Sequence, residues 1–325
     1  MYGEIALFSG NGNLELAQEI SAALAVPLCP ADVFKFSNQN IFCRLKTSVR
    51  GKDVFIIQPI AMSYDRRGAM QTVNDNLMEL LIMIDTAKRD SAGRITAVVP
   101  YYGYGRTDKK DQPRVPITAR LVADLITTAG ANRFLTIDLH AGQIQGFFNI
   151  PVDEITAFYS IRDYIREKNI PNAVVVAGDI GATKRSRNFA QALDLPLVVI
   201  EKRRLQKPDG SKTEVLNIIG DVRGKNCIIY DDEIDTAGTV VQAMDFLKQC
   251  GAEDIYTCVT HAILSGPAVQ RLIEAPVKEV VATNTVAISP DKDFAKLTRL
   301  SVAPLIAEVI RRVHLGISVG ELFDE

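Results

Sequence analysis

Apolar residues fall along this chain in two kinds of pattern. Short runs rich in Val, Ile and Leu alternate with longer segments in which apolar residues return at the spacing of a helix. The short runs predict strands at residues 5–8, 54–58, 95–100, 134–137, 174–177, 197–200, 227–230, 255–259 and 279–282. The longer segments predict helices that include residues 14–25, 76–88, 117–128, 183–193 and 239–249. Strands that alternate with helices in this way indicate an α/β fold with largely parallel sheets.

The two halves of the chain repeat each other. Residues 8–12 and residues 177–181 both lead from a strand through two glycines into a helix, and the strands on either side of Gly93 have counterparts on either side of Gly251. A repeat with a period near half the chain indicates a duplicated domain, although any α/β protein shows some echoes of this kind. We expect two similar domains, residues 1–152 and 153–325, with the last helix packing back on the first domain.

Composition sets the class of protein and excludes several others. With 325 residues, 47% of them apolar, the chain can form two hydrophobic cores. A formal net charge of −2 gives no overall attraction to nucleic acid or to a membrane surface, and the apolar runs are too short to span a bilayer. The five cysteines show neither a CxxC motif nor paired spacing, and the N-terminus lacks the features of a signal peptide. We therefore expect a cytoplasmic protein that binds neither nucleic acid nor membranes.

The most informative segment joins residues 227–230 to the helix that follows. The strand leads directly into Asp231 and Asp232, and a short loop then ends in Thr-Ala-Gly-Thr at residues 236–239. Free N–H groups at the start of a helix bind phosphate, and neighbouring carboxylates can hold sugar hydroxyls or a divalent cation. A helix cap needs one capping residue, so it does not explain several carboxylates beside this loop. The segment predicts a site for a phosphorylated sugar.

Other candidates have ordinary explanations that the residues alone leave open. His140 shares a strand end with Asp138, and Asp179 stands between Gly178 and Gly181, where a turn residue is equally natural. The short basic run at residues 201–204 is of a kind that usually lies on the solvent-exposed surface. An aromatic ring at Phe36 can stack on a purine or pack in a core, and an arginine is a forked donor suited to phosphates.

Several longer segments together resemble one family. They are residues 74–80, 100–110 (Pro-Tyr-Tyr-Gly-Tyr-Gly-Arg-Thr-Asp-Lys-Lys), 114–118 and 138–147 (Asp-Leu-His-Ala-Gly-Gln-Ile-Gln-Gly-Phe), in addition to 231–239. The chain resembles the ribose-phosphate diphosphokinases, also called phosphoribosyl pyrophosphate synthetases, over essentially its whole length. The resemblance implies two domains of the type I phosphoribosyltransferase fold. It also implies transfer of a diphosphoryl group from ATP to ribose 5-phosphate with Mg²⁺, in a hexamer.

The same resemblance implies a role for individual residues. The catalytic pair would be Lys202 and Arg204, on a flexible loop, and the metal ligands would be His140 and Asp179. Ribose 5-phosphate would contact Asp231, Asp232, Asp235, Thr236, Ala237, Gly238 and Thr239. ATP would contact Phe36, Asn38, Gln39, Asn40, Arg106 and Thr107.

The chain departs from the family pattern at two places. Residues 38–40 read Asn-Gln-Asn where the family has Asp-Gly-Glu, and Thr107 stands where Gln is common. The amide oxygens can replace the lost carboxylates as acceptors for the adenine amino group, so the choice of nucleotide is open. Residues 61–73 form an insert, either an idle loop or one that alters subunit contacts. Two other functions stay open, a regulatory homologue without activity and a phosphoribosyltransferase acting on a base.

Overall fold

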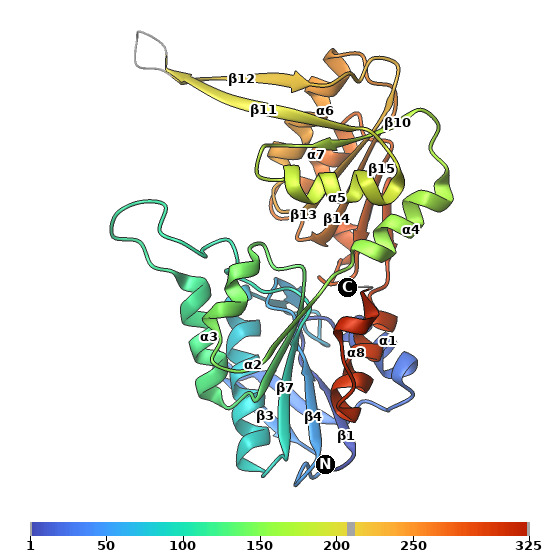
Figure 1. The fold of residues 1–325 in the computed structure, drawn as a ribbon. Helices are drawn as coiled ribbons and strands as arrows, with labels where there is room; N and C mark the ends of the chain where they lie inside the picture. The colour runs from blue at the N-terminus through green and yellow to red at the C-terminus, as the bar shows by residue number, and fades with distance from the viewer. Residues whose placement is uncertain (1, 207–211, 324–325) are drawn as a thin grey trace. The chain divides into compact units, whose positions relative to one another are not determined.

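The computed structural model describes residues 2–206 and 212–323, and for residues 202–206 and 212–216 it describes the backbone alone. The chain forms two compact units (Figure 1). Unit 1 comprises Met1–Thr156, Asn284–Ser289 and Ser301–Glu325, and unit 2 comprises Ala157–Thr283 and Pro290–Leu300. The first crossing from one unit to the other therefore follows Thr156, where the sequence suggested a boundary after residue 152.

Unit 1 is built on a five-stranded parallel sheet with the order β1-β4-β7-β8-β9. The strands are β1 (Ile5–Ser9), β4 (Asp53–Ile57), β7 (Arg94–Val99), β8 (Arg133–Ile137) and β9 (Val152–Ile155). Its helices are α1 (Leu14–Leu24), α2 (Val73–Arg89), α3 (Thr118–Ala129) and α8 (Ala303–Leu315), with short 3₁₀ turns at Gly142–Phe147 and Gly320–Leu322. Two small antiparallel ribbons complete the unit: β2 (Ala31–Lys35) with β3 (Ile41–Leu45), and β5 (Ser63–Tyr64) with β6 (Met70–Gln71).

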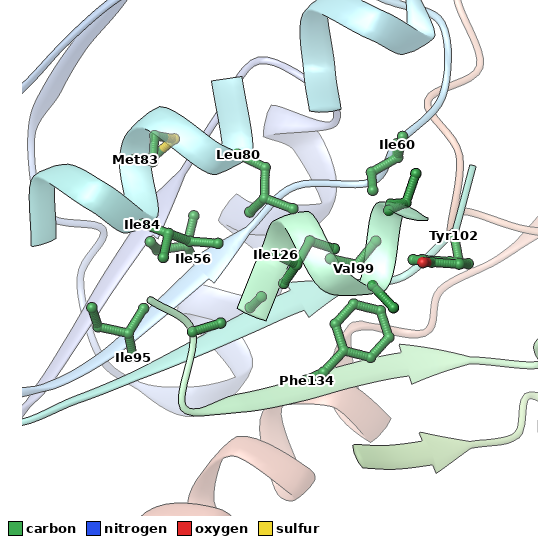
Figure 2. Close-up of a cluster of buried hydrophobic side chains, with 14 of the residues drawn as sticks. Ile56, Ile60, Leu80, Met83, Ile84, Ile95, Val99, Tyr102, Ile126 and Phe134 are labelled. Carbon is green, nitrogen blue, oxygen red and sulfur yellow. The ribbon is translucent and has the colours of Figure 1, made fainter. Parts of the chain in front are cut away.

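The core of unit 1 lies between this sheet and the helices α2 and α3. Figure 2 shows Ile56 and Val99 from the sheet facing Leu80, Ile84 and Ile126 from the two helices. Strand residues buried on both faces explain why β4 and β7 read as continuous apolar runs, as strands of parallel sheets do.

The last helix, α8, is part of unit 1 and packs against α1. A buried ion pair fixes its end, because Arg94 Nη2 lies 2.5 Å from Asp53 Oδ2 and donates to the carbonyl of Val313 at 2.9 Å. His314 Nδ1 lies 2.9 Å from the same Asp53 oxygen. The C-terminal helix is thus held by strands β4 and β7.

Unit 2 is built on a seven-stranded sheet with the order β12-β11-β10-β13-β14-β15-β16, parallel except for the edge strand β12. The strands are β10 (Ala173–Ala177), β11 (Leu197–Gln206), β12 (Lys212–Ile219), β13 (Asn226–Ile234), β14 (Ile255–Ala262), β15 (Glu279–Thr283) and β16 (Leu297–Leu300). Helices α4 (Phe158–Lys168) and α5 (Thr183–Leu193) pack together, as do α6 (Gly238–Gln249) and α7 (Ala268–Glu274). A 3₁₀ turn spans Pro290–Lys292.

The α/β class and the mainly parallel sheets are as the sequence predicted, but two strands are longer than expected. β11 continues past residue 200 to Gln206, because β12 pairs with it from Val199 onward. β13 continues past residue 230 to Ile234, because it pairs with β14 as far as Ala262. Along the described parts of the chain, no helix has the length and apolar character needed to cross a membrane.

Candidate functional site

Asp231 and Asp232 lie on strand β13 rather than in a loop. The segment between β13 and α6 is short and sharply bent, with Ala237 in the left-handed region at φ 60° and ψ 4°. Ala237 precedes the first residue of α6 and has no side-chain acceptor, so the first N–H groups of the helix are not capped by that side chain. Such a helix start is suited to an anion. We call residues 235–239 the 235–239 loop.

The strand order of unit 2 explains why this position can bind a ligand. From β10 the chain crosses to β11 on one side of the sheet, and from β13 it crosses to β14 on the other side. The sheet therefore has a switch point between β10 and β13, and ligands of open α/β sheets bind at the carboxyl ends of strands at such a point. The segment 178–181 follows β10 and the 235–239 loop follows β13, so the structure brings Asp179 and this loop to the same edge.

Arg185, on α5, binds both carboxylates of β13. Its Nη1 lies 2.7 Å from Asp231 Oδ1 and 2.7 Å from Asp232 Oδ1. Burial lowers the pKa of the guanidinium, but attraction to Asp232 and Asp231 outweighs it and raises the pKa. Burial, followed by the adjacent Asp232, raises the pKa of Asp231 to about 7, although Arg185 acts in the opposite direction. Asp231 is therefore protonated more readily than an exposed aspartate.

Arg185 is not among the site residues predicted from the sequence. A signal was present, because α5 opens with Thr-Lys-Arg-Ser-Arg, and cations in the first turn of a helix oppose the helix dipole. A basic helix start indicates an anionic partner nearby, which here is the Asp231–Asp232 pair.

Arg271 is a second cation that sequence reasoning did not find. Its Nη1 donates to the carbonyl of Thr236 at 2.9 Å, and a Cβ built on Gly238 would lie 3.3 Å from the same nitrogen. The guanidinium thus supports the backbone of the 235–239 loop from α7. Loops of this kind keep their shape through such side-chain bonds to carbonyls.

The two residues predicted to be catalytic, Lys202 and Arg204, lie on β11, opposite Leu216 and Glu214 of β12. Their side chains, and residues 207–211 of the predicted flexible loop, lie outside the described part of the structure. Figure 1 shows the β11–β12 hairpin extending from the edge of the unit 2 sheet.

In unit 1, the residues predicted to bind the nucleotide lie in two different parts of the structure. Arg106 and Thr107 are exposed in a turn after β7, where the Thr107 hydroxyl donates to the carbonyl of Tyr104 at 2.6 Å. His140 follows the neighbouring strand β8 and is also exposed. Parallel strands end at one edge of a sheet, so the structure brings Arg106, Thr107 and His140 to the same edge of unit 1.

Residues 36–40 instead form the turn of the β2–β3 ribbon. The N–H of Phe36 donates to the carbonyl of Asn40 at 2.8 Å, and Gln39 has φ 69°. Asn38 Oδ1 accepts the N–H of Asn40 at 3.1 Å. The amide oxygen expected to replace a family carboxylate is therefore already engaged in the turn. Phe36 is 48% exposed, so its ring is available for stacking.

The residues present fit a magnesium ion that shares its coordination with substrate. Mg²⁺ keeps several waters and takes one or two protein carboxylates together with phosphate oxygens. Asp179 presents an exposed carboxylate at the carboxyl edge of unit 2, with Oδ1 accepting the N–H of Ala182 at 2.8 Å. Within the described ranges, no three His, Cys, Asp or Glu side chains form a metal cluster.

Two α/β units, one with a helix start without a capping side chain at Ala237 beside paired carboxylates at a switch point, are typical of the class of proteins with phosphoribosyltransferase-type folds. The sequence matches the N-terminal domain of ribose phosphate pyrophosphokinase over residues 5–130 and the phosphoribosyl synthetase-associated domain over residues 208–324. The chain belongs to the ribose-phosphate pyrophosphokinase family.

Individual relatives agree over the full length. A ribose-phosphate pyrophosphokinase of Caldanaerobacter subterraneus is 51% identical over 320 residues, covering 98% of each chain. The enzyme of that name from Clostridium tetani is 48% identical, covering 98% of this chain and 97% of the relative. The crystal structure of phosphoribosylpyrophosphate synthetase from Mycobacterium smegmatis superimposes with a TM-score of 0.88 at 43% identity, covering 97% of this chain and all of the other. The predicted family and fold are confirmed, whereas the roles of the individual site residues stay predictions.

Proposed function

We propose that this chain transfers the β,γ-diphosphoryl group of ATP to the anomeric hydroxyl of ribose 5-phosphate, giving 5-phosphoribosyl 1-diphosphate and AMP. The observation that carries the proposal is the arrangement at the end of β13. A helix start at Gly238 without a capping side chain at Ala237 is suited to the 5-phosphate, and Asp231 and Asp232 on the preceding strand are suited to the sugar hydroxyls. Similarity to pyrophosphokinases over nearly the whole chain supports the reaction type.

On the acceptor side, we assign Thr236, Ala237, Gly238 and Thr239 to the 5-phosphate and Asp231, Asp232 and Asp235 to the ribose. Arg185 holds the Asp231–Asp232 pair in place, and Arg271 supports the loop backbone at Thr236. These contacts orient the sugar, and orientation accounts for much of the rate in phosphoryl transfer.

On the donor side, we assign Phe36 to the base, with Asn38, Gln39 and Asn40 beside it, and Arg106 and Thr107 to the phosphates. Lys202 and Arg204 would stabilise charge on the transferring group, and a loop that closes over them would exclude water. His140 would contact the Mg²⁺ bound to ATP, and Asp179 would hold a second metal ion near the ribose. When bound, these ions would neutralise phosphate charge.

We further propose that the chain works as a homo-oligomer, a hexamer by family resemblance, in the cytoplasm. The free thiols of Cys29, Cys43, Cys227, Cys250 and Cys258 support a reducing compartment. Light scattering on the purified protein measures the oligomeric state directly.

The reaction is tested by incubating the protein with ribose 5-phosphate, Mg²⁺ and ATP and measuring AMP and phosphoribosyl diphosphate. We expect both products in equal amounts. Folded protein that releases no nucleoside monophosphate with any nucleoside triphosphate would indicate a regulatory homologue. Activity only when phosphoribosyl diphosphate and a base are supplied would indicate a phosphoribosyltransferase.

A further inference from the structure

The insert at residues 61–73 is an ordered hairpin rather than a loose loop. Strands β5 and β6 pair Ser63 with Gln71 and Tyr64 with Met70. At the tip, Asp65 Oδ1 accepts the N–H groups of Arg67 at 2.8 Å and Ala69 at 2.9 Å. Since one carboxylate holds two backbone donors, the tip has a defined shape.

The base of this hairpin is fixed in the buried part of unit 1. Ser63 is 3% exposed, and its hydroxyl donates to the carbonyl of Asn11 at 3.1 Å and accepts from Asn76 Nδ2 at 2.9 Å. Gln71 is 1% exposed. A hairpin held by buried hydrogen bonds at its base keeps its direction, because breaking those bonds would leave buried polar groups unpaired.

The tip of the hairpin reaches the β2–β3 ribbon. The guanidinium carbon of Arg67 lies 5.8 Å from the centroid of the Phe34 ring, within the range of a cation–π contact. Lys35 Nζ donates to the carbonyl of Met70 at 3.5 Å. A pocket of about 140 Å³ separates the two elements, with Val33 and Phe34 on one wall and Arg66 and Arg67 on the other.

Phe34 belongs to an aromatic cluster on the ribbon. Its ring centroid lies 5.2 Å from that of Phe36 and 5.2 Å from that of Phe42, and Phe36 and Phe42 are 5.7 Å apart. Rings at these separations attract one another in tilted and edge-to-face arrangements. A chain of contacts therefore leads from Arg67 through Phe34 to the exposed Phe36 ring.

We propose that the insert hairpin is a positioning element for the nucleotide base, with Arg67 setting the orientation of Phe36 through Phe34. The inference rests on the proposed assignment of Phe36 to the base of ATP. Arg67 acts on the substrate indirectly, so its loss changes the affinity for nucleotide without changing the transfer step. The insert in this chain is thus part of the donor site.

The test compares Arg67→Ala with the matched control Arg66→Ala, which removes the same charge from the next residue. Within the described residues, Arg67 has a ring contact and Arg66 has none. Arg67→Ala should raise KM for ATP by about two- to fivefold, the range of an exposed cation–π contact. KM for ribose 5-phosphate and kcat should not change. Arg66→Ala should leave all three constants unchanged. Arg67→Lys keeps the positive charge and should retain most of the wild-type affinity for ATP.

Phe36→Ala separates failure of this inference from failure of the assignment on which it depends. If Phe36→Ala raises KM for ATP but Arg67→Ala behaves like Arg66→Ala, the coupling is wrong and the assignment of Phe36 stands. If Phe36→Ala leaves KM for ATP unchanged, the base does not bind at this ribbon and both statements fail. Equal losses with Arg66→Ala and Arg67→Ala would show a general effect of charge and overturn the role of the ring contact.

Discussion

The pKa of Asp231 shows how burial and a neighbouring charge act together on one carboxylate. Arg185 Nη1 lies 2.7 Å from Asp231 Oδ1 and 2.7 Å from Asp232 Oδ1. Burial, followed by the adjacent Asp232, nevertheless raises the pKa of Asp231. A neutral residue at position 231 would not have this cost of ionisation.

The raised pKa predicts a distinct pH dependence of stability for Asp231→Asn. The pKa of Asp231 is raised from 3.8 to about 7 in the folded protein, so the folded state binds more protons than the unfolded chain in this window. The wild-type protein therefore loses stability as pH rises through the window. The variant lacks this loss, so its unfolding free energy relative to wild type should increase by about 1 kcal/mol from pH 4 to pH 8, after allowing for solvent screening.

Urea denaturation of the unliganded proteins at several pH values measures the effect. Asp221→Asn is the control of opposite sign, because a hydrogen bond from the Arg223 N–H lowers the pKa of Asp221. That variant should lose stability relative to wild type as pH rises toward about 4, and the difference should then stay constant at higher pH. If Asp231→Asn follows the same direction as Asp221→Asn, the pKa of Asp231 is not raised in the folded protein and the prediction is wrong.

At the residue scale, the sequence is informative where a motif is continuous and uninformative where a contact joins distant segments. The run from Asp231 to Thr239 indicates a phosphorylated-sugar site because its carboxylates and helix start are adjacent in the chain. Arg185 is 46 residues from Asp231, and only the pairing of β10 with β13 brings α5 to it. The engagement of Asn38 Oδ1 in its own turn is likewise visible only in the structure.

At the scale of elements, apolar runs located the central strands because a strand buried on both faces must be apolar throughout. The ribbon β2–β3 was missed, since its residues are half-buried and include Asp32, Lys35 and Arg44. The outer part of β11 was missed for a related reason. Its sequence, Glu-Lys-Arg-Arg-Leu-Gln, has no apolar face, and pairing with β12 alone makes it a strand.

The attachment of α8 to unit 1 also depends on a contact that the sequence does not reveal. Asp53 is fully buried on β4 and contacts both Arg94 and His314. Asp53→Ala leaves the Arg94 guanidinium without its carboxylate and removes the contact to the end of α8. We expect a loss of about 3–5 kcal/mol in the free energy of unfolding, as for other broken buried pairs.

Denaturant titration of Asp53→Ala gives this value, and Asp85→Ala is the control. Asp85 pairs with Arg89 one turn away on the exposed face of α2, and its removal should not measurably change stability. If the two variants lose similar amounts, the Asp53 pair contributes no more than a surface pair and α8 is held by apolar packing alone.

At the scale of the whole molecule, the two substrates of the proposed reaction are assigned to different units. The ribose 5-phosphate residues lie in unit 2, and those assigned to ATP lie in unit 1. Duplication of an α/β unit provides two sheet edges of similar construction, one for the donor and one for the acceptor. Divergence of the loops then gives each edge its own ligand, as commonly occurs when one fold carries several functions.

This division predicts that the binding of each substrate can be weakened without affecting the binding of the other. Thr239→Val removes a hydroxyl at the start of α6 while keeping the shape of the side chain, and it should raise the dissociation constant of ribose 5-phosphate about five- to tenfold. Arg106→Ala should raise the dissociation constant of ATP about tenfold, because it removes a charged hydrogen bond to phosphate. Neither variant should change binding of the other substrate, and the double variant should combine the two losses to within about twofold.

Isothermal titration calorimetry with each substrate alone measures the dissociation constants of both substrates for each variant. A loss of ATP affinity in Thr239→Val would show that the two units do not bind their substrates separately, and the assignment of donor and acceptor to different units would then have to be abandoned.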